Sequence, residues 1–389
     1  MHEKVKELLS KATQGPISFI DAEVVFENIM DGNLSEVEIS SFLTSLKVRG
    51  ESIDELTAAA SIMRKKSLKV LNGENAVDIV GTGGDGMNTL NISTASSLLV
   101  ASTGMKVAKH GNRKISSLAG ASDTLEILGI NTFMEPKVAQ KSLEQFNYCF
   151  MLAPIYHPAM KNVMPVRQEL GYRTVFNILG PLTNPASVKY QLIGVYEKSL
   201  ALKMIEVLRN LNTKRAWVVH GSDGTDEISI TGETYVVELD RGKIKEFKIS
   251  PEDANLKSCD FSEILGGSPE FNAQKIEQLV NGEKSGFFYS VIFNSAVALN
   301  ISEKVKNIQD VGISSTKVVG NIFKKPFALE GVKLDFRPVS SKSSLFKLTT
   351  SCGESSLSPL IKKDNKPLVI RASEYPSQKS LPSLNEPFT

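Results

Sequence analysis

The sequence predicts an α/β protein with a small N-terminal helical domain and a larger α/β domain, whose mostly parallel central sheet has flanking helices. Residues 1 to about 70 carry apolar side chains at helical spacing. From about Ala76, short apolar runs alternate with helical patterns, which is typical of a parallel sheet with crossover helices. The length of 389 residues is sufficient for two or three domains with buried cores.

Residues 1–72 are predicted to form a bundle of short helices. Apolar residues such as Val5, Leu8 and Leu9 recur at helical spacing in the first helix. The next three helices have capping residues at their expected starts, namely Ser18 to Asp21, Ser35 with Glu38, and Ser52 with Asp54 and Glu55. No charged constellation occurs here, so we expect a structural or dimer-forming role.

Residues 73–335 are predicted to form the α/β domain. Its expected strands are Val77–Val80, Lys106–Lys109, Asn131–Met134, Cys149–Leu152, Tyr190–Val195 and Ala216–Val219. A helix is expected over Asn162–Leu170, with a loop-rich stretch over Asn177–Pro185, and we expect the helices around 162–185 to join the N-terminal domain. Residues 336–389, rich in Ser and Lys, are expected to be a flexible low-complexity extension.

Composition excludes several classes of protein. The net charge of +2 gives no overall argument for binding nucleic acid or a membrane. Three cysteines that lie far apart favour a reducing compartment over a disulfide framework or a zinc site. The polar start shows no signal peptide, and no run of 18 apolar residues occurs, so we expect a cytoplasmic protein.

A glycine-rich stretch after the first predicted strand indicates a phosphate site. The strand Val77–Val80 runs into Gly81–Gly86, and Asn91–Thr94 marks the start of a helix. Glycines allow a close backbone approach to a ligand, and the free N–H groups of a helix start favour an anion. Asp85 would repel a bare phosphate, so it suggests sugar hydroxyls or a metal nearby.

Other interpretations of the glycines are weaker. The letters match the dinucleotide pattern G-x-G-x-x-G, but residues 101–108 supply no acidic residue for a ribose, and four residues separate the glycines from the helix. A P-loop is excluded because Met87 and Asn88 stand where Lys and Ser or Thr are required. A glycine-rich turn between strand and helix that binds no ligand is the remaining alternative.

A basic segment follows the second strand. Lys109, Arg113, Ser116 and Ser117 stand at the carboxyl edge of the predicted sheet, where α/β folds bind ligands. The two cations can neutralise phosphate oxygens and the serines can donate hydrogen bonds to them. A solvated basic turn is the alternative.

An acidic loop, His220–Glu227, follows the strand that ends at Val219. Carboxylates in such a loop suit Mg²⁺, which prefers oxygen ligands and shares itself with substrate phosphates. The order of residues is not that of an EF-hand, and a simple acidic turn stays an equal alternative.

A third polar set comprises Tyr156–Met160 and Val166–Gly171. Arg167 could bind a substrate carboxylate in a bidentate geometry. From the sequence alone, a surface ion pair with Glu169 or a neighbour is the favoured explanation of Arg167, and His157 is ambiguous in the same way.

Four segments together resemble the anthranilate phosphoribosyltransferase family. They read GTGGDGMNTLNISTA, KHGNRKISSLAGASDTLEILGI, HPAMKNVMPVRQELGYRTVFNILGPLTNP and HGSDGTDEIS. The resemblance covers residues from about 5 to 300, fades near Ile313 and leaves the chain after about Phe323 without a counterpart. It implies transfer of phosphoribosyl from phosphoribosyl pyrophosphate (PRPP) to the amine of anthranilate in tryptophan biosynthesis, by a homodimer with a helical and an α/β domain.

The resemblance also implies roles for individual residues. PRPP would be bound by Gly81, Gly84, Asp85, Thr89, Asn91, Ile92, Ser93, Thr94, Lys109, His110, Gly111, Asn112, Arg113, Lys114, Ile115, Ser116, Ser117 and Ala121. Two Mg²⁺ ions would be bound by Ser93, Asp226 and Glu227, and anthranilate by Gly81, Asn112 and Arg167.

The residue types agree with such chemistry. Negative charge builds on pyrophosphate as its bond to the ribose breaks, and Mg²⁺, Lys109 and loop N–H groups can stabilise that charge. Catalysis would then be electrostatic and positional, without a covalent nucleophile. The alternatives are relatives with another activity, the pyrimidine nucleoside phosphorylases, or with a nucleic-acid-binding role. Asn112, Arg167 and the Asp226–Glu227 pair favour the transferase.

Overall fold

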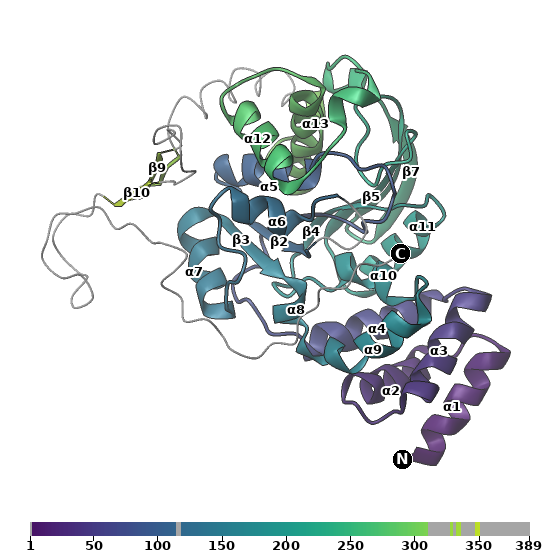
Figure 1. Ribbon diagram of the computed structural model, residues 1–389. Helices are drawn as coiled ribbons and strands as arrows, with labels where there is room; N and C mark the ends of the chain where they lie inside the picture. The colour runs from purple at the N-terminus through teal and green to yellow at the C-terminus, as the bar shows by residue number, and fades with distance from the viewer. Residues whose placement is uncertain (1, 114–117, 310–326, 330–331, 336–346, 351–389) are drawn as a thin grey trace, which may run out of the picture. The chain divides into compact units, whose positions relative to one another are not determined.

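The computed structural model describes residues 2–113, 118–309, 327–329, 332–335 and 347–350 (Figure 1). The chain divides into two compact units, Met1–Lys324 and Lys325–Thr389. The first unit holds a helical bundle and a seven-stranded sheet. In the second unit, β8 (Phe327–Leu329), β9 (Val332–Asp335) and β10 (Lys347–Thr350) form an antiparallel sheet in the order β10-β9-β8.

The N-terminal helices begin where their caps predict. They are α1 (His2–Gln14), α2 (Phe19–Met30), α3 (Glu36–Arg49) and α4 (Ile53–Lys66). The Ser18 side chain accepts the N–H of Asp21, and Ser35 and Ser52 form capping boxes with Glu38 and Glu55. The three predicted caps are thus confirmed.

The central sheet confirms the predicted fold class. Its order is β3-β2-β1-β4-β5-β6-β7, and the first five of these strands are parallel to one another. The parallel strands are β1 (Val77–Gly81), β2 (Val107–Gly111), β3 (Tyr148–Leu152), β4 (Tyr190–Gly194) and β5 (Arg215–Gly221). The antiparallel strands are β6 (Thr234–Asp240) and β7 (Lys243–Ile249).

Two strand assignments differ from the sequence prediction. The hairpin β6–β7 was not predicted; its two-residue turn has Arg241 at φ 47° and Gly242 at φ 85°, the positive angles that a tight hairpin requires. The prediction of a strand over Asn131–Met134 is wrong, because this segment is a loop between α6 (Ala121–Ile127) and α7 (Pro136–Phe146). There the Asn131 side chain accepts the N–H of Phe133, and the Phe133 side chain is exposed, so the segment is turned locally instead of joining a strand.

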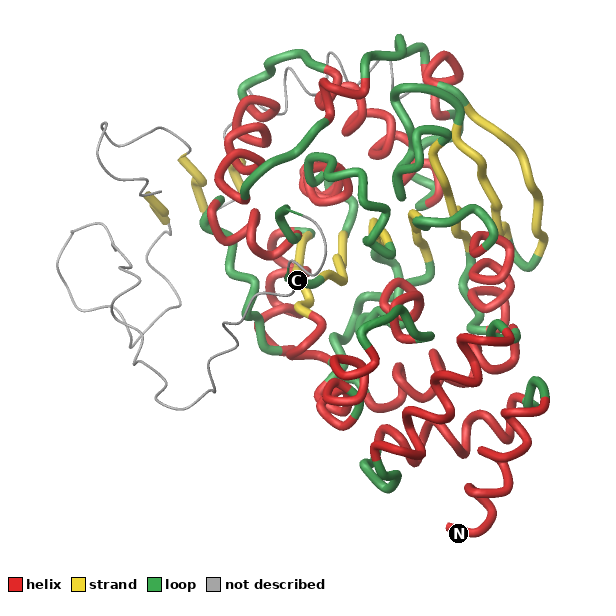
Figure 2. Tube along the Cα trace, turned by 45° about the vertical axis from the view of Figure 1, so that its right-hand side comes forward, coloured by secondary structure: helices red, strands yellow, loops and turns green. Residues whose placement is uncertain are grey.

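Alternate residues of the strands point into two different cores. Ile79 and Val219 belong to the core with the helices α5 (Ile92–Ser102) and α13 (Gly286–Ile301). Val80 and Val218 belong to the core with the N-terminal bundle. The parallel strands of the central sheet, yellow in Figure 2, therefore lie between two groups of helices. Both faces of the sheet are covered, so the strands' ends are where ligands can reach it.

The other helices complete the first unit. The α-helices are α5 (Ile92–Ser102), α6 (Ala121–Ile127), α7 (Pro136–Phe146), α8 (Ala153–Tyr156), α9 (Met164–Leu170), α10 (Phe176–Leu179), α11 (Leu200–Asn210), α12 (Pro269–Val280) and α13 (Gly286–Ile301). The 3₁₀ helices are η1 (Pro158–Asn162), η2 (Gly180–Leu182), η3 (Pro251–Ala254) and η4 (Phe261–Ile264). Helix α9 packs against α3, and α10 against α4, so this part of the chain does contact the N-terminal bundle (Figure 1).

Two remaining predictions concern the ends of the chain and membranes. Strand β10 lies within the predicted 336–389 extension, whose other residues lie outside those described. None of the helices in the described residues is long and apolar enough to cross a membrane.

Candidate active site

Two loops and the end of strand β2 meet at the carboxyl edge of the sheet. The glycine loop, defined here as residues 82–86, follows β1 and leads through Asn91 to the first turn of α5. Strand β2 ends with Lys109, His110 and Gly111, and the acidic loop with Asp226 and Glu227 follows β5. Because these strands are parallel, their carboxyl ends share one edge, as the sequence predicts.

The acidic loop is bonded directly to the glycine loop and to α5. The Asp226 Oδ2 atom accepts the N–H of Gly83 at 2.7 Å, and the Glu227 Oε1 atom accepts the N–H of Ser93 at 3.0 Å. The Asp226 N–H donates to the Asp85 carboxylate at 3.3 Å. The structure thus brings together Asp85, Ser93, Asp226 and Glu227, which lie far apart in the sequence.

Two strand-ending glycines make room for Asp226. A Cβ atom on Gly81 would lie 2.2 Å from the Asp226 Oδ2 atom, and one on Gly194 would lie 1.6 Å from the Asp226 carbonyl oxygen. Both distances are far below van der Waals contact, so no side chain fits at either strand end without displacing the acidic loop.

The grouped carboxylates carry an excess of negative charge. Burial, and then the charge of Asp85, raises the pKa of Asp226 to about 7. Burial, and then the charge of Asp226, raises the pKa of Glu227 well above its ordinary value. Each carboxylate would lose this penalty beside a cation, so the site is suited to bind one.

The donor atoms fit Mg²⁺. The side chains of Ser93, Asp226 and Glu227 offer a hydroxyl and two carboxylates, the oxygen ligands that Mg²⁺ prefers. Among the described residues, no group of three or more His, Cys, Asp or Glu side chains is placed to hold a metal ion by itself. A partial set of protein ligands is what Mg²⁺ uses when water and substrate phosphates fill its other positions.

Lys109 is the buried cation of the site. Its Nζ atom donates to the carbonyl oxygen of Ile79 at 2.5 Å and to the Ser93 Oγ atom at 3.3 Å, and its side chain is 2% exposed. Burial lowers the pKa of Lys109, while the charges of Asp78, Glu227 and Asp226 oppose that change. Lys109 therefore stands between two sets of carboxylates.

Asp78 is a buried partner of this lysine that the sequence analysis did not select. It accepts the N–H of His110 at 3.2 Å and the Nδ2 of Asn184 at 2.7 Å, and Asn184 also donates to the carbonyl of Ala108 at 2.9 Å. Burial raises the pKa of Asp78 to about 6. The signal was present, because Asp78 interrupts an otherwise apolar strand, and a buried carboxylate requires partners.

A buried histidine pair joins the end of β2 to the residue after α8. The His110 Nδ1 atom is 3.0 Å from the carbonyl oxygen of Gly180, and its Nε2 atom is 3.2 Å from the His157 Nε2 atom. Because a carbonyl only accepts, Nδ1 of His110 carries the proton, and the Nε2–H of His157 donates to Nε2 of His110. Burial lowers the pKa of His110 to about 4 and that of His157 to about 3.

The remaining residues predicted to bind PRPP differ in their surroundings. Asn91 bonds to Ala119, Thr124 and Asn272, so its side chain holds the starts of α6 and α12 near the loop. Ile92 is buried in the core, and the hydroxyl of buried Thr94 has no hydrogen-bond partner among the described residues. Thr89 forms an isolated β-bridge with Leu265. Gly84 lies in the glycine loop, Gly111 is the last residue of β2, and Ala121 is the first residue of α6.

The basic segment is only partly described. Arg113 donates to the Glu126 carboxylate of α6 at 2.9 Å and lies over the ring of Phe133, so its charge is paired outside the basic segment. The Asn112 side chain accepts the N–H of Arg113 at 2.8 Å. The predicted ligands Lys114, Ile115, Ser116 and Ser117 lie outside the described residues.

Arg167 is a half-buried guanidinium on α9. It contacts the sulfur of Met164 and the ring of Phe176. Within the described part of the chain, no ion pair involves Arg167, so the alternative of a pair with Glu169 is not seen. Burial lowers its pKa. An unpaired guanidinium of this kind is suited to a substrate carboxylate.

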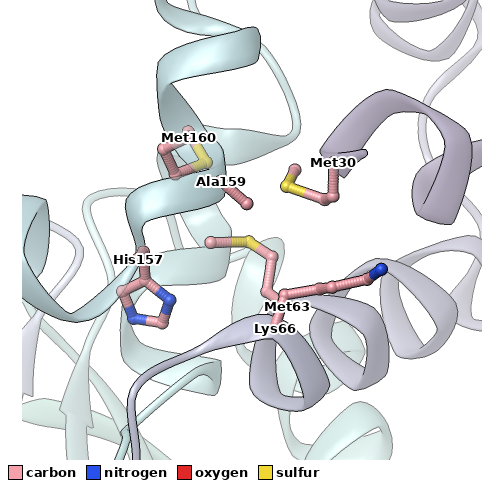
Figure 3. A pocket seen from close by; sticks show the side chains of 6 residues that line it. All are labelled: Met30, Met63, Lys66, His157, Ala159 and Met160. Atoms are coloured by element: carbon pink, nitrogen blue, oxygen red, sulfur yellow. The ribbon is translucent and has the colours of Figure 1, made fainter. Parts of the chain in front are cut away.

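A separate apolar pocket lies away from the grouped carboxylates. Its walls are Met30, Met63, Lys66, His157, Ala159 and Met160 (Figure 3). Three methionines and an alanine dominate it, and none of the predicted ligand-binding residues contributes. The pocket thus reflects packing between the bundle and η1.

Comparisons with known proteins identify the family of this chain. Residues 6–67 match a family model described as "Glycosyl transferase family, helical bundle domain", and residues 73–319 match "Glycosyl transferase family, a/b domain". An anthranilate phosphoribosyltransferase of Parvibaculum lavamentivorans is 44% identical over 325 residues, which is 83% of this chain and 95% of that protein. The chain belongs to the anthranilate phosphoribosyltransferase family.

Other members support the same assignment. The enzyme of Methanobrevibacter smithii is 46% identical over 307 residues, 79% of this chain and 92% of that one. The crystal structure of anthranilate phosphoribosyltransferase from Thermus thermophilus has a TM-score of 0.76 at 35% identity, covering 83% of this chain and 98% of that chain. The family match ends at residue 319, close to where the resemblance fades in the sequence.

Solved structures of the Saccharomyces cerevisiae member include ligands. One is in complex with PRPP and Mg, with a TM-score of 0.70 at 27% identity over 82% of this chain and 93% of that chain. Another is in complex with 4-fluoroanthranilate, with a TM-score of 0.72 at 27% identity over 83% of this chain and 96% of that chain.

Proposed function

We propose that this chain transfers the phosphoribosyl group of PRPP to the amine of anthranilate, giving N-(5-phosphoribosyl)anthranilate and pyrophosphate in tryptophan biosynthesis. The observation that carries the proposal is the meeting of Asp226 and Glu227 with the glycine loop and Ser93. A carboxylate pair beside a phosphate-type loop is suited to a metal-bound pyrophosphate.

In this proposal PRPP occupies the glycine loop and the first turn of α5, bound by the residues assigned to it from Gly81 to Ala121. Two Mg²⁺ ions per subunit, bound by Ser93, Asp226 and Glu227, would offset the charge of the pyrophosphate. Lys109 assists the leaving group from the sheet side, since its ammonium lies 3.3 Å from the Ser93 hydroxyl.

Anthranilate approaches from the side of α9 in the same proposal. Arg167 receives its carboxylate, and Gly81 and Asn112 form the rest of that pocket. The bond from the ribose carbon to pyrophosphate breaks, the neutral amine attacks that carbon, and the amine then loses a proton. An aromatic amine is already neutral near pH 7, so positioning replaces a strong general base.

The same proposal extends to organisation. Residues 1–72 act as the helical domain, joined by the helices around 162–185, and 73–335 act as the PRPP-binding domain, with 336–389 as an extension. The protein works as a cytoplasmic homodimer. These statements rest on the sequence and on the family resemblance.

Product analysis tests the function. Purified protein with PRPP, Mg²⁺ and anthranilate should give one pyrophosphate per N-(5-phosphoribosyl)anthranilate, identified by chromatography and mass. Parallel samples contain a pyrimidine nucleoside with phosphate, or labelled DNA at two salt concentrations. Phosphorolysis or salt-sensitive DNA binding without the anthranilate product would replace the transferase with a relative's function.

A further inference from the structure

Arg173 connects the segment after α9 to the glycine loop. Helix α9 ends at Leu170 and is followed by its C-cap residue Gly171, which has a left-handed φ of 63°. The Nη2 atom of Arg173 donates to the carbonyl oxygen of Gly84. Its guanidinium carbon lies 4.0 Å from the centroid of the Tyr196 ring, so the ring fixes the plane of the guanidinium.

The glycine loop depends on such contacts for its conformation. Gly83 and Gly84 have φ angles of 66° and 75°, and glycines lose more backbone freedom on ordering than other residues. The acidic loop orders one side, because Asp226 accepts the N–H of Gly83 at 2.7 Å. Arg173 orders the other side through the carbonyl of Gly84.

Tyr196 is itself fixed to the same loop. Its N–H donates to the Thr82 Oγ1 atom at 3.1 Å, and the N–H of Thr82 donates to the carbonyl of Gly194 at 2.9 Å. The ring under Arg173 therefore stands in a set position relative to Gly84. Within the described residues, no ion pair holds Arg173, so the carbonyl and the ring are the contacts that define its place.

We infer that Arg173 is a positioning residue: it holds the glycine loop in the conformation that receives PRPP and links this loop to the segment that carries Arg167. The inference rests on the proposed function. Arg173 acts before the chemical step, because it orders the loop without contacting the reacting atoms. Its loss should weaken PRPP binding and leave turnover of the bound complex nearly unchanged.

Steady-state kinetics of Arg173→Ala test this role. A hydrogen bond from a charged group stabilises enough that its loss raises the KM for PRPP about tenfold, with kcat and the KM for anthranilate within about twofold. Arg209→Ala is the matched control, since Arg209 is an exposed arginine of α11 paired with Glu206. A fall in kcat at unchanged KM, or no change at all, would overturn the inference.

A double variant separates a role through the loop from direct contact with the substrate. A Cβ on Gly84 would lie 2.8 Å from the Arg173 Nη2 atom, so Gly84→Ala already displaces the guanidinium. If Arg173 acts through the loop, adding Arg173→Ala to Gly84→Ala raises the KM for PRPP no further. If the two substitutions instead multiply their effects on the KM for PRPP, Arg173 contacts PRPP independently of the loop, and the inference is contradicted.

Hydrogen exchange without ligand makes the test independent of activity. In Arg173→Ala, the amides of residues 82–86 should exchange at least about fivefold faster than in the wild type, while those of β1 keep their rates. Unchanged exchange in the loop would overturn the inference even if the enzyme is active. An inactive wild type with faster exchange in the variant would instead count against the proposed function alone.

Discussion

The ammonium of Lys109 lies 3.3 Å from the hydroxyl of Ser93, while the N–H of Ser93 donates to Glu227. One residue at the start of α5 thus joins the buried cation of β2 to the acidic loop after β5. The first turn of α5 thus contacts the positive charge of Lys109 through the Ser93 hydroxyl and the carboxylate of Glu227 through the Ser93 N–H.

Lys109→Met should lower kcat about 100-fold, because it removes a buried positive charge beside the developing charge of pyrophosphate. The KM for anthranilate should stay within about twofold. Steady-state rates with varied anthranilate at saturating PRPP measure both.

The same substitution leaves Asp78 buried without its cation, so unfolding must be measured as well. The double variant Asp78→Asn with Lys109→Met should regain stability without regaining activity. Lys106→Met, just before the same strand, is the control for loss of a lysine. Full activity in Lys109→Met at saturating PRPP would rule out a role in catalysis.

Arg167→Ala should raise the KM for anthranilate about 10- to 100-fold, because a charged hydrogen-bond donor for its carboxylate is lost. Arg167→Lys should recover only part of this, since an ammonium cannot form the bidentate pair. The KM for PRPP serves as the internal control. An equal rise in both KM values would mean that α9 had moved and that no specific contact had been lost.

Chelation of Mg²⁺ should abolish turnover, and added Mg²⁺ should restore it. Glu227→Gln should lower activity at least about 100-fold, yet raise the thermal midpoint of the metal-free protein. The gain follows because the neutral amide no longer repels Asp226. Thermal unfolding with and without Mg²⁺ measures this; a variant that is less stable and still fully active would show that Glu227 has a structural role.

The His110–His157 pair should make stability depend on pH. Both pKa values lie below the ordinary 6.5, at about 4 and about 3, so between pH 6.5 and 4 the unfolded chain binds protons that the folded one does not. The free energy of unfolding should therefore decrease as the pH is lowered from 6.5 to 4, by about 1.4 kcal/mol per pH unit for each such histidine. The charge of Lys109 opposes protonation of His110, and the charge of Lys69 opposes that of His157. The hydrogen bond between Asp78 and His110 is made by the backbone N–H of His110.

His157→Gln tests this pH dependence, since the amide can still donate to His110 but cannot titrate. Its urea midpoints at pH 7.5, 5.5 and 4.5 should fall less steeply than those of the wild type. Parallel curves would show that the buried pair does not set the acid sensitivity of the fold.

Local patterns explain which parts of the fold were predictable. The apolar strands β1 to β5 and the caps at Ser35 and Ser52 follow from rules that act within a few residues. The hairpin β6–β7 was missed because β7 is mostly exposed and rich in charged residues, so it lacks the apolar run of a buried strand. The loop Asn131–Met134 was misassigned because a local side-chain bond outweighed its apolar character.

The site shows the same division. The grouping of the glycine loop with Lys109 and Asp226 follows from strands that share an edge. The contacts of Arg113 with Glu126 and of Arg173 with Gly84 depend on how side chains cross between elements, which no spacing in the sequence encodes. Such contacts become visible only when the elements are assembled.

The loss of anthranilate fluorescence on mixing tests the central claim most directly. With purified protein, PRPP and Mg²⁺ together, the fluorescence should fall until the limiting substrate is consumed, and omission of PRPP, Mg²⁺ or protein should each prevent the fall. Constant fluorescence in the complete mixture, with protein shown to be folded, would contradict the account.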